Sequence, residues 1–196
     1  MTLATRLTRR LGIVHPIISA PMAFAAGGRL ASAVTSAGGL GLIGGGYGDA
    51  AWIENEFKAA GNQKIGCGFI TWSLKKQPEL LDRVLEHKPR AIFLSFGNPE
   101  VFIDKIKSAG AIPICQVQTL KDAKHAIASG AEIIVAQGGE AGGHGEGRGT
   151  LTLVPEVADA IAAMNPETLL LAAGGIGDGR GLAAGLALGA DGVLIG

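Results

Sequence analysis

The strongest constraint on the fold of this sequence is an alternation of short apolar runs with segments of helical spacing. The runs are too short to form helices, and they carry Ile, Val and Leu at consecutive positions, as parallel strands buried on both faces do. These runs lie at residues 17–22, 40–44, 64–70, 91–97, 112–117, 132–137, 169–173 and 192–196. We therefore expect eight parallel strands.

The segments between the runs have the apolar spacing of amphipathic helices, as in Leu30, Val34 and Ala37. Glycine makes up 32 of the 196 residues, well above the roughly 7% of average proteins, and it follows no collagen-like period. Four of these glycines fit the left-handed position that ends a helix shortly before the next run, namely Gly38, Gly110, Gly130 and Gly189. The repeated unit is a helix followed by a strand.

Units of this kind fit an α/β fold of the TIM type, a (β/α)8 barrel, better than an open doubly wound sheet, because eight parallel strands close around a packed interior. We expect a single barrel domain over residues 1–196. Such barrels typically have about 250 residues, whereas this sequence ends on its eighth run, without a final helix. The outer face of that strand then needs a cover, which further residues or a second subunit of a homo-oligomer could supply.

Composition excludes several classes of function. Lys and Arg number 17, as do Asp and Glu, so the formal net charge of zero offers no footprint for nucleic acid or an anionic membrane. The first ten residues lack a following apolar region of a secretory signal, and no run approaches 18 apolar residues. Cys67 and Cys115 lie in apolar runs and are expected to be buried thiols rather than a disulfide. A cytoplasmic protein is the expectation.

The segment after the sixth run is the richest in chemistry, because active sites of such barrels lie at the carboxyl ends of the strands. Residues 136–149 combine seven glycines with Gln137, Glu140, His144 and Arg148. A mobile surface loop could have this composition too. However, glycine lets the backbone approach a ligand, and imidazole is well suited to proton transfer near neutral pH. We therefore expect His144 to be a catalytic residue.

Two further strand ends carry candidate binding segments. Residues 173–181 are glycine-rich and precede a helix expected to begin near Leu182, so backbone amides and a helix N-terminus could meet a phosphate there. A structural tight turn explains the same residues equally well. Pro21 interrupts the first run and should bend the backbone at the barrel mouth. No His, Cys or Asp spacing typical of a metal site occurs.

Several of these segments together resemble a known family. They are 16–23 (PIISAPMA), 37–41 (AGGLG), 136–144 (AQGGEAGGH), 173–176 (AGGI) and 189–193 (GADGV), in this order along the whole chain. This combination resembles the nitronate monooxygenases, formerly called 2-nitropropane dioxygenases. The EAGGH element is specific for that family and its near relatives, whereas the other pieces occur in many FMN barrels.

The resemblance implies an FMN-containing barrel that uses O2 to oxidise small alkyl nitronates to carbonyl compounds and nitrite. It implies that His144 faces the flavin and binds the substrate or abstracts a proton. The cofactor-binding residues that it implies are Ala20, Pro21, Met22, Gln137, Gly142, Gly143, Gly174, Gly175, Ile195 and Gly196.

Two departures from the family pattern stand out. The family often has Gly-Val-Asn-Leu on strand three, with the asparagine touching the flavin, but this sequence has Gly68 there. Family members also continue beyond strand eight with a Thr-Arg-Phe segment and a helical region. Two rival functions therefore stay open: an FMN-dependent reductase acting on enoyl-acyl carrier protein or quinones with NAD(P)H, and a flavin-free relic or regulatory partner. The Ala20-Pro21-Met22 segment favours the monooxygenases over the enoyl reductases.

Overall fold

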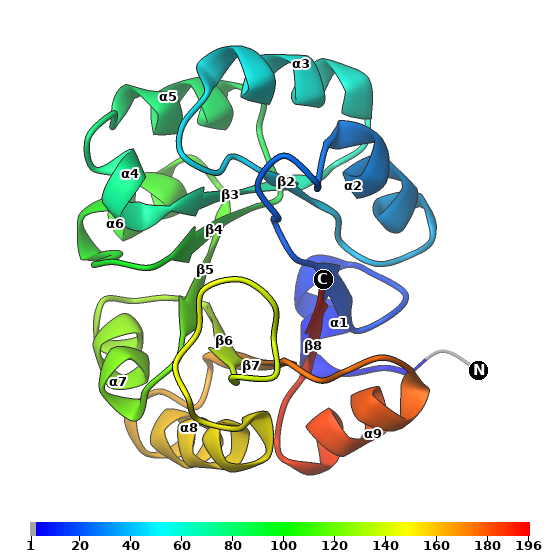
Figure 1. Ribbon diagram of the computed structural model, residues 1–196, viewed down its shortest axis with the longest axis vertical. Coiled ribbons are helices and arrows are strands. Elements are labelled where there is room, and N and C mark those ends of the chain that lie inside the picture. Colours follow the sequence, from blue (N-terminus) through cyan, green and yellow to red (C-terminus); the bar gives the residue numbers. More distant parts are fainter. Residues whose placement is uncertain (1–2) are drawn as a thin grey trace.

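The structure is a computed structural model that describes residues 3–196, and it contains the expected parallel barrel. The strands are β1 (Ile17–Ser19), β2 (Leu42–Gly44), β3 (Gly66–Ile70), β4 (Ala91–Ser95), β5 (Ile112–Val117), β6 (Ile133–Gln137), β7 (Leu169–Ala173) and β8 (Gly192–Ile195). They form one sheet in the order β1-β8-β7-β6-β5-β4-β3-β2, and all paired strands are parallel (Figure 1). The prediction of eight parallel strands in a (β/α)8 barrel is confirmed.

The barrel closes where β1 meets the start of β2. Ile18 and Leu40 form a parallel bridge, and the Ser19 amide donates to the Leu40 carbonyl oxygen at 3.0 Å. Two residues further on, the Leu42 amide donates to the Ser19 hydroxyl oxygen at 3.1 Å, so a side chain replaces the next backbone acceptor. Both edges of the sheet are thereby joined.

Two apolar clusters follow from the alternation of side chains along the strands. The inner cluster fills the barrel and includes the strand residues Phe93, Ile114 and Val135. Leu7 and Leu11 of α1 (Arg6–Leu11) also belong to it. The outer cluster lies between the strands and the helices that surround them in Figure 1. These helices are α2 (Gly28–Ser36), α3 (Ala50–Ala60), α4 (Thr71–Leu74), α5 (Glu79–Glu86), α6 (Glu100–Ser108), α7 (Leu120–Ala128), α8 (Thr150–Met164) and α9 (Gly179–Ala187).

Some boundaries differ from expectation for local reasons. β1 ends at Ser19, before Pro21, which has no amide hydrogen to continue the ladder. β4 ends at Ser95 because Phe96 takes a left-handed conformation with a φ of 57°. α9 begins at Gly179 rather than near Leu182, since the Asp178 carboxylate accepts a hydrogen bond from the Arg180 amide and caps the helix earlier.

The two cysteines are free and buried, as predicted. Cys67 and Cys115 belong to the outer cluster. Burial disfavours the thiolate and raises the pKa of both thiols to about 12. Neither side chain is therefore a ready nucleophile.

The expectation that the outer face of β8 is left bare is correct only in part. Val193 is fully buried, whereas Ile195 is half-buried. An apolar groove of about 410 Å³ lies beside Ile195, and residues of β1, α2 and α9 line it, including Ile17, Leu30 and Leu182. α9 thus covers one of the two outward aliphatic side chains, and the groove marks the part of this face that α2 and α9 do not cover.

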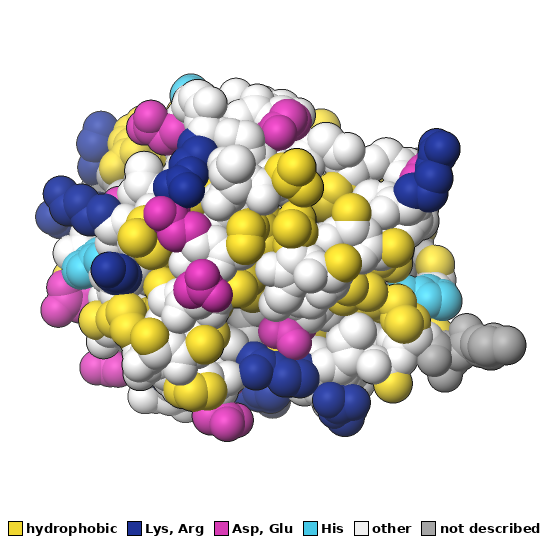
Figure 2. All heavy atoms as spheres, turned by 90° about the horizontal axis from the view of Figure 1, so that it is seen from below, with side chains coloured by type: hydrophobic (Ala, Val, Ile, Leu, Met, Phe, Trp, Pro, Cys, Tyr) yellow, Lys and Arg dark blue, Asp and Glu magenta, His cyan; other side chains and the backbone are white. Residues whose placement is uncertain are grey.

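The face formed by α8 and α9 is of mixed character. Figure 2, which views the molecule from this side, shows apolar side chains across the middle and most charged side chains toward one end and the lower edge. Leu151 and Met164 of α8 are among the exposed apolar residues.

Within residues 3–196, no helix combines the length and the hydropathy needed to cross a bilayer. The oligomeric state and the cytoplasmic location stay predictions.

The closure predicts a measurable cost for Ser19→Ala. This change leaves the buried Leu42 amide without its acceptor, which should lower the free energy of unfolding by about 1–3 kcal/mol. Urea denaturation followed by circular dichroism measures it. Ser36→Ala, at the exposed end of α2, is the matched control and should stay within about 0.5 kcal/mol of the parent. Equal midpoints for the two variants would contradict this role of Ser19.

Candidate active site

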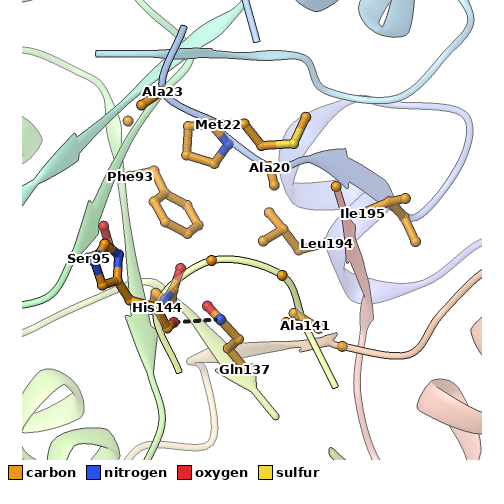
Figure 3. A pocket seen from close by; sticks show the side chains of 18 of the residues that line it. Ala20, Met22, Ala23, Phe93, Ser95, Gln137, Ala141, His144, Leu194 and Ile195 are labelled. Atoms are coloured by element: carbon orange, nitrogen blue, oxygen red, sulfur yellow. Dashed lines mark hydrogen bonds between the residues drawn. The ribbon is translucent and has the colours of Figure 1, made fainter. Parts of the chain in front are cut away.

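A cavity of about 700 Å³ opens at the mouth of the barrel, at the carboxyl ends of the strands. Its wall includes all eleven site residues expected from the sequence: Ala20, Pro21, Met22, Gln137, Gly142, Gly143, His144, Gly174, Gly175, Ile195 and Gly196. Figure 3 shows Ala20 and Met22 on the opposite side of this cavity from Gln137 and His144, with Phe93 and Leu194 between them. Segments far apart in the sequence therefore converge on one site.

The segment after β1 forms one wall of the cavity. The Ala20 amide still donates to the Ile195 carbonyl oxygen of β8 at 2.7 Å, and the Met22 amide turns back to the Ala20 carbonyl at 2.9 Å. Pro21 then packs against Gly68 of β3, where a Cβ atom would lie 2.4 Å from two carbon atoms of the proline ring. The Pro21 ring thus occupies the space that a side chain at position 68, the family's asparagine position, would need.

The glycine-rich segment after β6 forms the opposite wall. Gln137 is buried, and its Nε2 atom donates to the His144 carbonyl oxygen at 3.2 Å, the dashed line of Figure 3. The His144 side chain is exposed, and its ring lies edge-on to that of Phe96, with 5.5 Å between the ring centroids. Within the described residues, neither imidazole nitrogen has a hydrogen-bond partner. The imidazole is therefore free to bind a ligand.

Glu140 ties this segment to the start of α8. Its carboxylate accepts hydrogen bonds from the Thr150 amide, at 3.1 and 2.8 Å, and from the Thr150 hydroxyl at 2.8 Å. The N-cap residue of α8 is Gly149, which has no side chain to cap the helix, so Glu140 takes that role. These hydrogen bonds, first of all the one from the Thr150 amide, hold the pKa of the Glu140 carboxyl below its usual value.

The end of β7 requires glycine for a close approach. The Thr150 hydroxyl oxygen lies 3.1 Å from the Gly174 carbonyl oxygen, and a Cβ atom on Gly174 would come within 2.6 Å of that hydroxyl. Gly174 also has a φ of 111°, which other residues rarely adopt. The missing side chain of Gly174 therefore lets the Thr150 hydroxyl of α8 and the backbone of the glycine-rich segment approach the end of β7 closely.

Several lining residues were not predicted from the sequence. They include Tyr47, Phe69, Ile70, Phe96 and Gln116. Glu140 and Ile176 also line the cavity; they lie in segments that the sequence singled out, but they were not among the expected site residues. Tyr47 lies in the glycine-rich stretch 44–48 after β2, and this composition could have indicated it. Phe96 has one adjacent glycine, Gly97, and only its place at the end of β4 could have indicated it. Among the described residues that line the cavity, none is Lys or Arg, and the ionisable side chains are Tyr47, Glu140 and His144. Residues 3–196 also contain no cluster of three potential metal ligands.

Comparison with known proteins identifies the family. The family model described as nitronate monooxygenase matches residues 4–65 and 69–196. The chain belongs to the nitronate monooxygenase family. Between these two segments the match leaves out residues 66–68 of β3, and Gly68, the last of them, packs against Pro21.

Relatives within and around this family carry different names. A nitronate monooxygenase of Neurospora crassa is 36% identical over 92% of this chain and 58% of its own length. A dehydrogenase of Rhodococcus jostii, named for a hydroxy-methyl-oxo-octahydroindene-carboxyl-CoA, is 34% identical over the whole chain and 54% of its own length. The solved structure of FabK from Thermotoga maritima has a TM-score of 0.90 and 34% identity, covering 100% of this chain and 62% of that one. The chain thus spans just over half the length of these two curated relatives.

The Glu140 bonds predict a pH-dependent protection of the α8 N-terminus. Because the pKa of Glu140 is lowered in the folded chain, its contribution is complete above the unfolded value and is lost as the pH falls through the folded value. The protection factor of the Thr150 amide in hydrogen exchange should fall over this acidic range. In Glu140→Gln a neutral amide oxygen, a weaker acceptor, replaces the carboxylate. The protection factor should there be independent of pH and, above this range, lower than in the parent. In the exposed control Glu167→Gln it should match the parent. A parent-like profile in Glu140→Gln would rule out this contact.

Proposed function

We propose that this chain is the FMN-binding barrel of an oxidoreductase that uses O2 to convert alkyl nitronates into carbonyl compounds and nitrite. The observation that carries the proposal is the convergence of the EAGGH histidine, His144, with the strand-one bend and the glycines of β7 and β8 on one cavity. Membership of the nitronate monooxygenase family supports the reaction class.

The residues present fit a flavin. The cavity lies within the roughly 300–1,000 Å³ typical of small-molecule sites. At Gly142, Gly143 and Gly177 a Cβ atom would meet no other atom within 4 Å, so these positions leave open space along the wall. We assign the phosphate to the backbone amides after β7 and β8, and the ring to the bend at Pro21 and Met22. When bound, the flavin supplies the electron acceptor that O2 regenerates.

His144 performs the proton and charge chemistry in this proposal. A nitronate is already an anion, and an imidazolium would hold it in the cavity. A neutral nitroalkane must first lose a proton, which a neutral imidazole can accept. Since none of the described residues that line the cavity is Lys or Arg, His144 is the basic side chain among them that is available for either task.

The first test replaces this histidine. His144→Asn should lower turnover of nitronate or nitroalkane by about 10²–10⁴-fold, the range for a lost general acid or base. Steady-state oxygen consumption with each substrate measures it. His15→Asn, at the opposite end of the barrel, should retain parent activity. Turnover of both substrates within about threefold of the parent in His144→Asn would refute the assignment.

The second test addresses the phosphate position. Gly177 lines the cavity, has open space around its Cβ position and, unlike Gly175, does not adopt a positive φ. Gly177→Asp therefore adds a negative charge without a steric clash, and it should weaken FMN binding at least about tenfold by charge repulsion. Gly177→Asn introduces a side chain of the same shape without the charge, and this variant should bind FMN nearly as tightly as the parent does. Equal FMN affinities of the two variants, measured by fluorescence titration, would contradict the phosphate assignment.

A second candidate is a flavin-dependent dehydrogenase or reductase. It is favoured by the CoA-linked dehydrogenase, which is 34% identical over the whole chain. Anaerobic addition of NADH to the purified, FMN-loaded protein separates the two functions. Rapid bleaching of the flavin absorbance would support an NADH-dependent reductase, whereas bleaching by nitronate alone supports the monooxygenase. Failure to bind FMN at all would support the flavin-free alternative.

A further inference from the structure

His144 lies in a segment with little conformational preference of its own. Glycine occupies positions 142, 143, 145 and 147 around it. The backbone of such a segment has many accessible conformations, so a fixed position of the imidazole requires contacts from elsewhere. Glu140 fixes the segment four residues before His144, at the start of α8. That contact leaves the orientation of His144 itself undetermined.

Two amide side chains hold the backbone of His144. Gln118 Nε2 donates to the His144 carbonyl oxygen at 2.9 Å, and Gln137 Nε2 donates to the same oxygen at 3.2 Å. Gln137 ends β6, and Gln118 follows the end of β5, the neighbouring strand in the barrel. A carbonyl oxygen has two lone pairs, so both amides can bind it at once. His144 is thereby attached to two adjacent strands.

The imidazole is placed by contacts that leave its nitrogens free. Phe96, which follows β4, presents its ring to the imidazole in an edge-on arrangement. The left-handed φ of Phe96, 57°, is uncommon for an aromatic residue, and such strain persists only where surrounding structure holds it. Gln118 and Gln137 act on the carbonyl group, at the far end of the residue from the ring nitrogens. The three contacts together orient the imidazole while keeping its proton-transfer atoms available.

We infer that Gln118 is a positioning residue, which fixes His144 against Phe96 through the His144 carbonyl oxygen. Gln137 alone lies at the longer distance of 3.2 Å, and a single hydrogen bond lets the carbonyl rotate about the contact. The second donor, from Gln118, removes that freedom. The placement of His144 is a property of this chain by itself; its importance for catalysis rests on the proposed function.

The test follows the His144–Phe96 contact by NMR in the full chain without cofactor. The chain has four histidines, so His144→Asn assigns the His144 ring signals by their disappearance. The parent should show nuclear Overhauser contacts between the His144 and Phe96 rings. Gln118→Leu removes the donor at similar size, and these contacts should be lost. Gln63→Leu, an exposed glutamine before β3, is the control and should retain them.

Gln118→Glu separates a hydrogen-bonding role from packing. Near neutral pH the introduced carboxylate only accepts hydrogen bonds and repels the His144 carbonyl oxygen, so the ring contacts should be lost. Below the ordinary glutamate pKa of about 4.3, the protonated carboxyl donates and the contacts should return, measured against the parent at the same pH. Parent-like contacts in Gln118→Leu, or no recovery of Gln118→Glu in acid, would overturn the inference.

Catalysis provides an independent arm. In FMN-loaded protein, Gln118→Leu should lower nitronate turnover about tenfold or more while the FMN dissociation constant stays near that of the parent, because a misplaced acid or base loses rate without losing the cofactor. If the parent binds FMN but does not oxidise nitronates, the proposed function fails while the NMR result still decides the placement. If turnover is unchanged although the ring contacts are lost, Gln118 does not position a catalytic group.

Discussion

The closure of the sheet between β1 and β2 is the constraint on which the site depends. With the Ile18–Leu40 bridge and the Ser19 hydroxyl in place, all eight strands point their carboxyl ends at one opening. β1, β8, β7 and β6 are consecutive in the sheet, and closure curves the sheet so that the residues after β1 face those after β6 across this opening. An open sheet of the same strands would spread these segments along an edge, and His144 could not face Met22 across a cavity.

The parts of the fold that depend on periodicity were predictable. Runs of consecutive Ile, Val and Leu, with glycine at helix ends, indicate buried parallel strands because both faces of each strand are covered. Boundaries set by single backbone events were not predictable in the same way. The early end of β4 depends on the positive φ of Phe96, and the early start of α9 on the Asp178 carboxylate. Neither leaves a periodic trace in the sequence.

The candidate site likewise contains residues that a sequence pattern indicates and residues that only the fold brings into place. The expected cavity residues lie in glycine-rich or proline-containing strand ends, where the unusual composition itself carries information. Gln118 lies outside any such segment, and Phe96 was not singled out although Gly97 and Pro99 follow it. Their contacts with His144 arise only when β4, β5 and β6 are side by side. Gly68 is an intermediate case: the missing side chain is visible in the sequence, but its compensation by the Pro21 ring appears only in the fold.

The absence of Lys and Arg among the described cavity-lining residues has an evolutionary consequence under the proposed phosphate assignment. A site that binds an anion with basic side chains can lose its affinity through one ordinary codon change. A site built from peptide amides keeps its donors whatever the side chains become, with proline as the exception, and fails only when the chain path changes. Amino-acid substitutions along this wall should therefore be limited by the backbone path that they must preserve. Related chains can then differ in the substrates they accept while retaining the same anion-binding backbone.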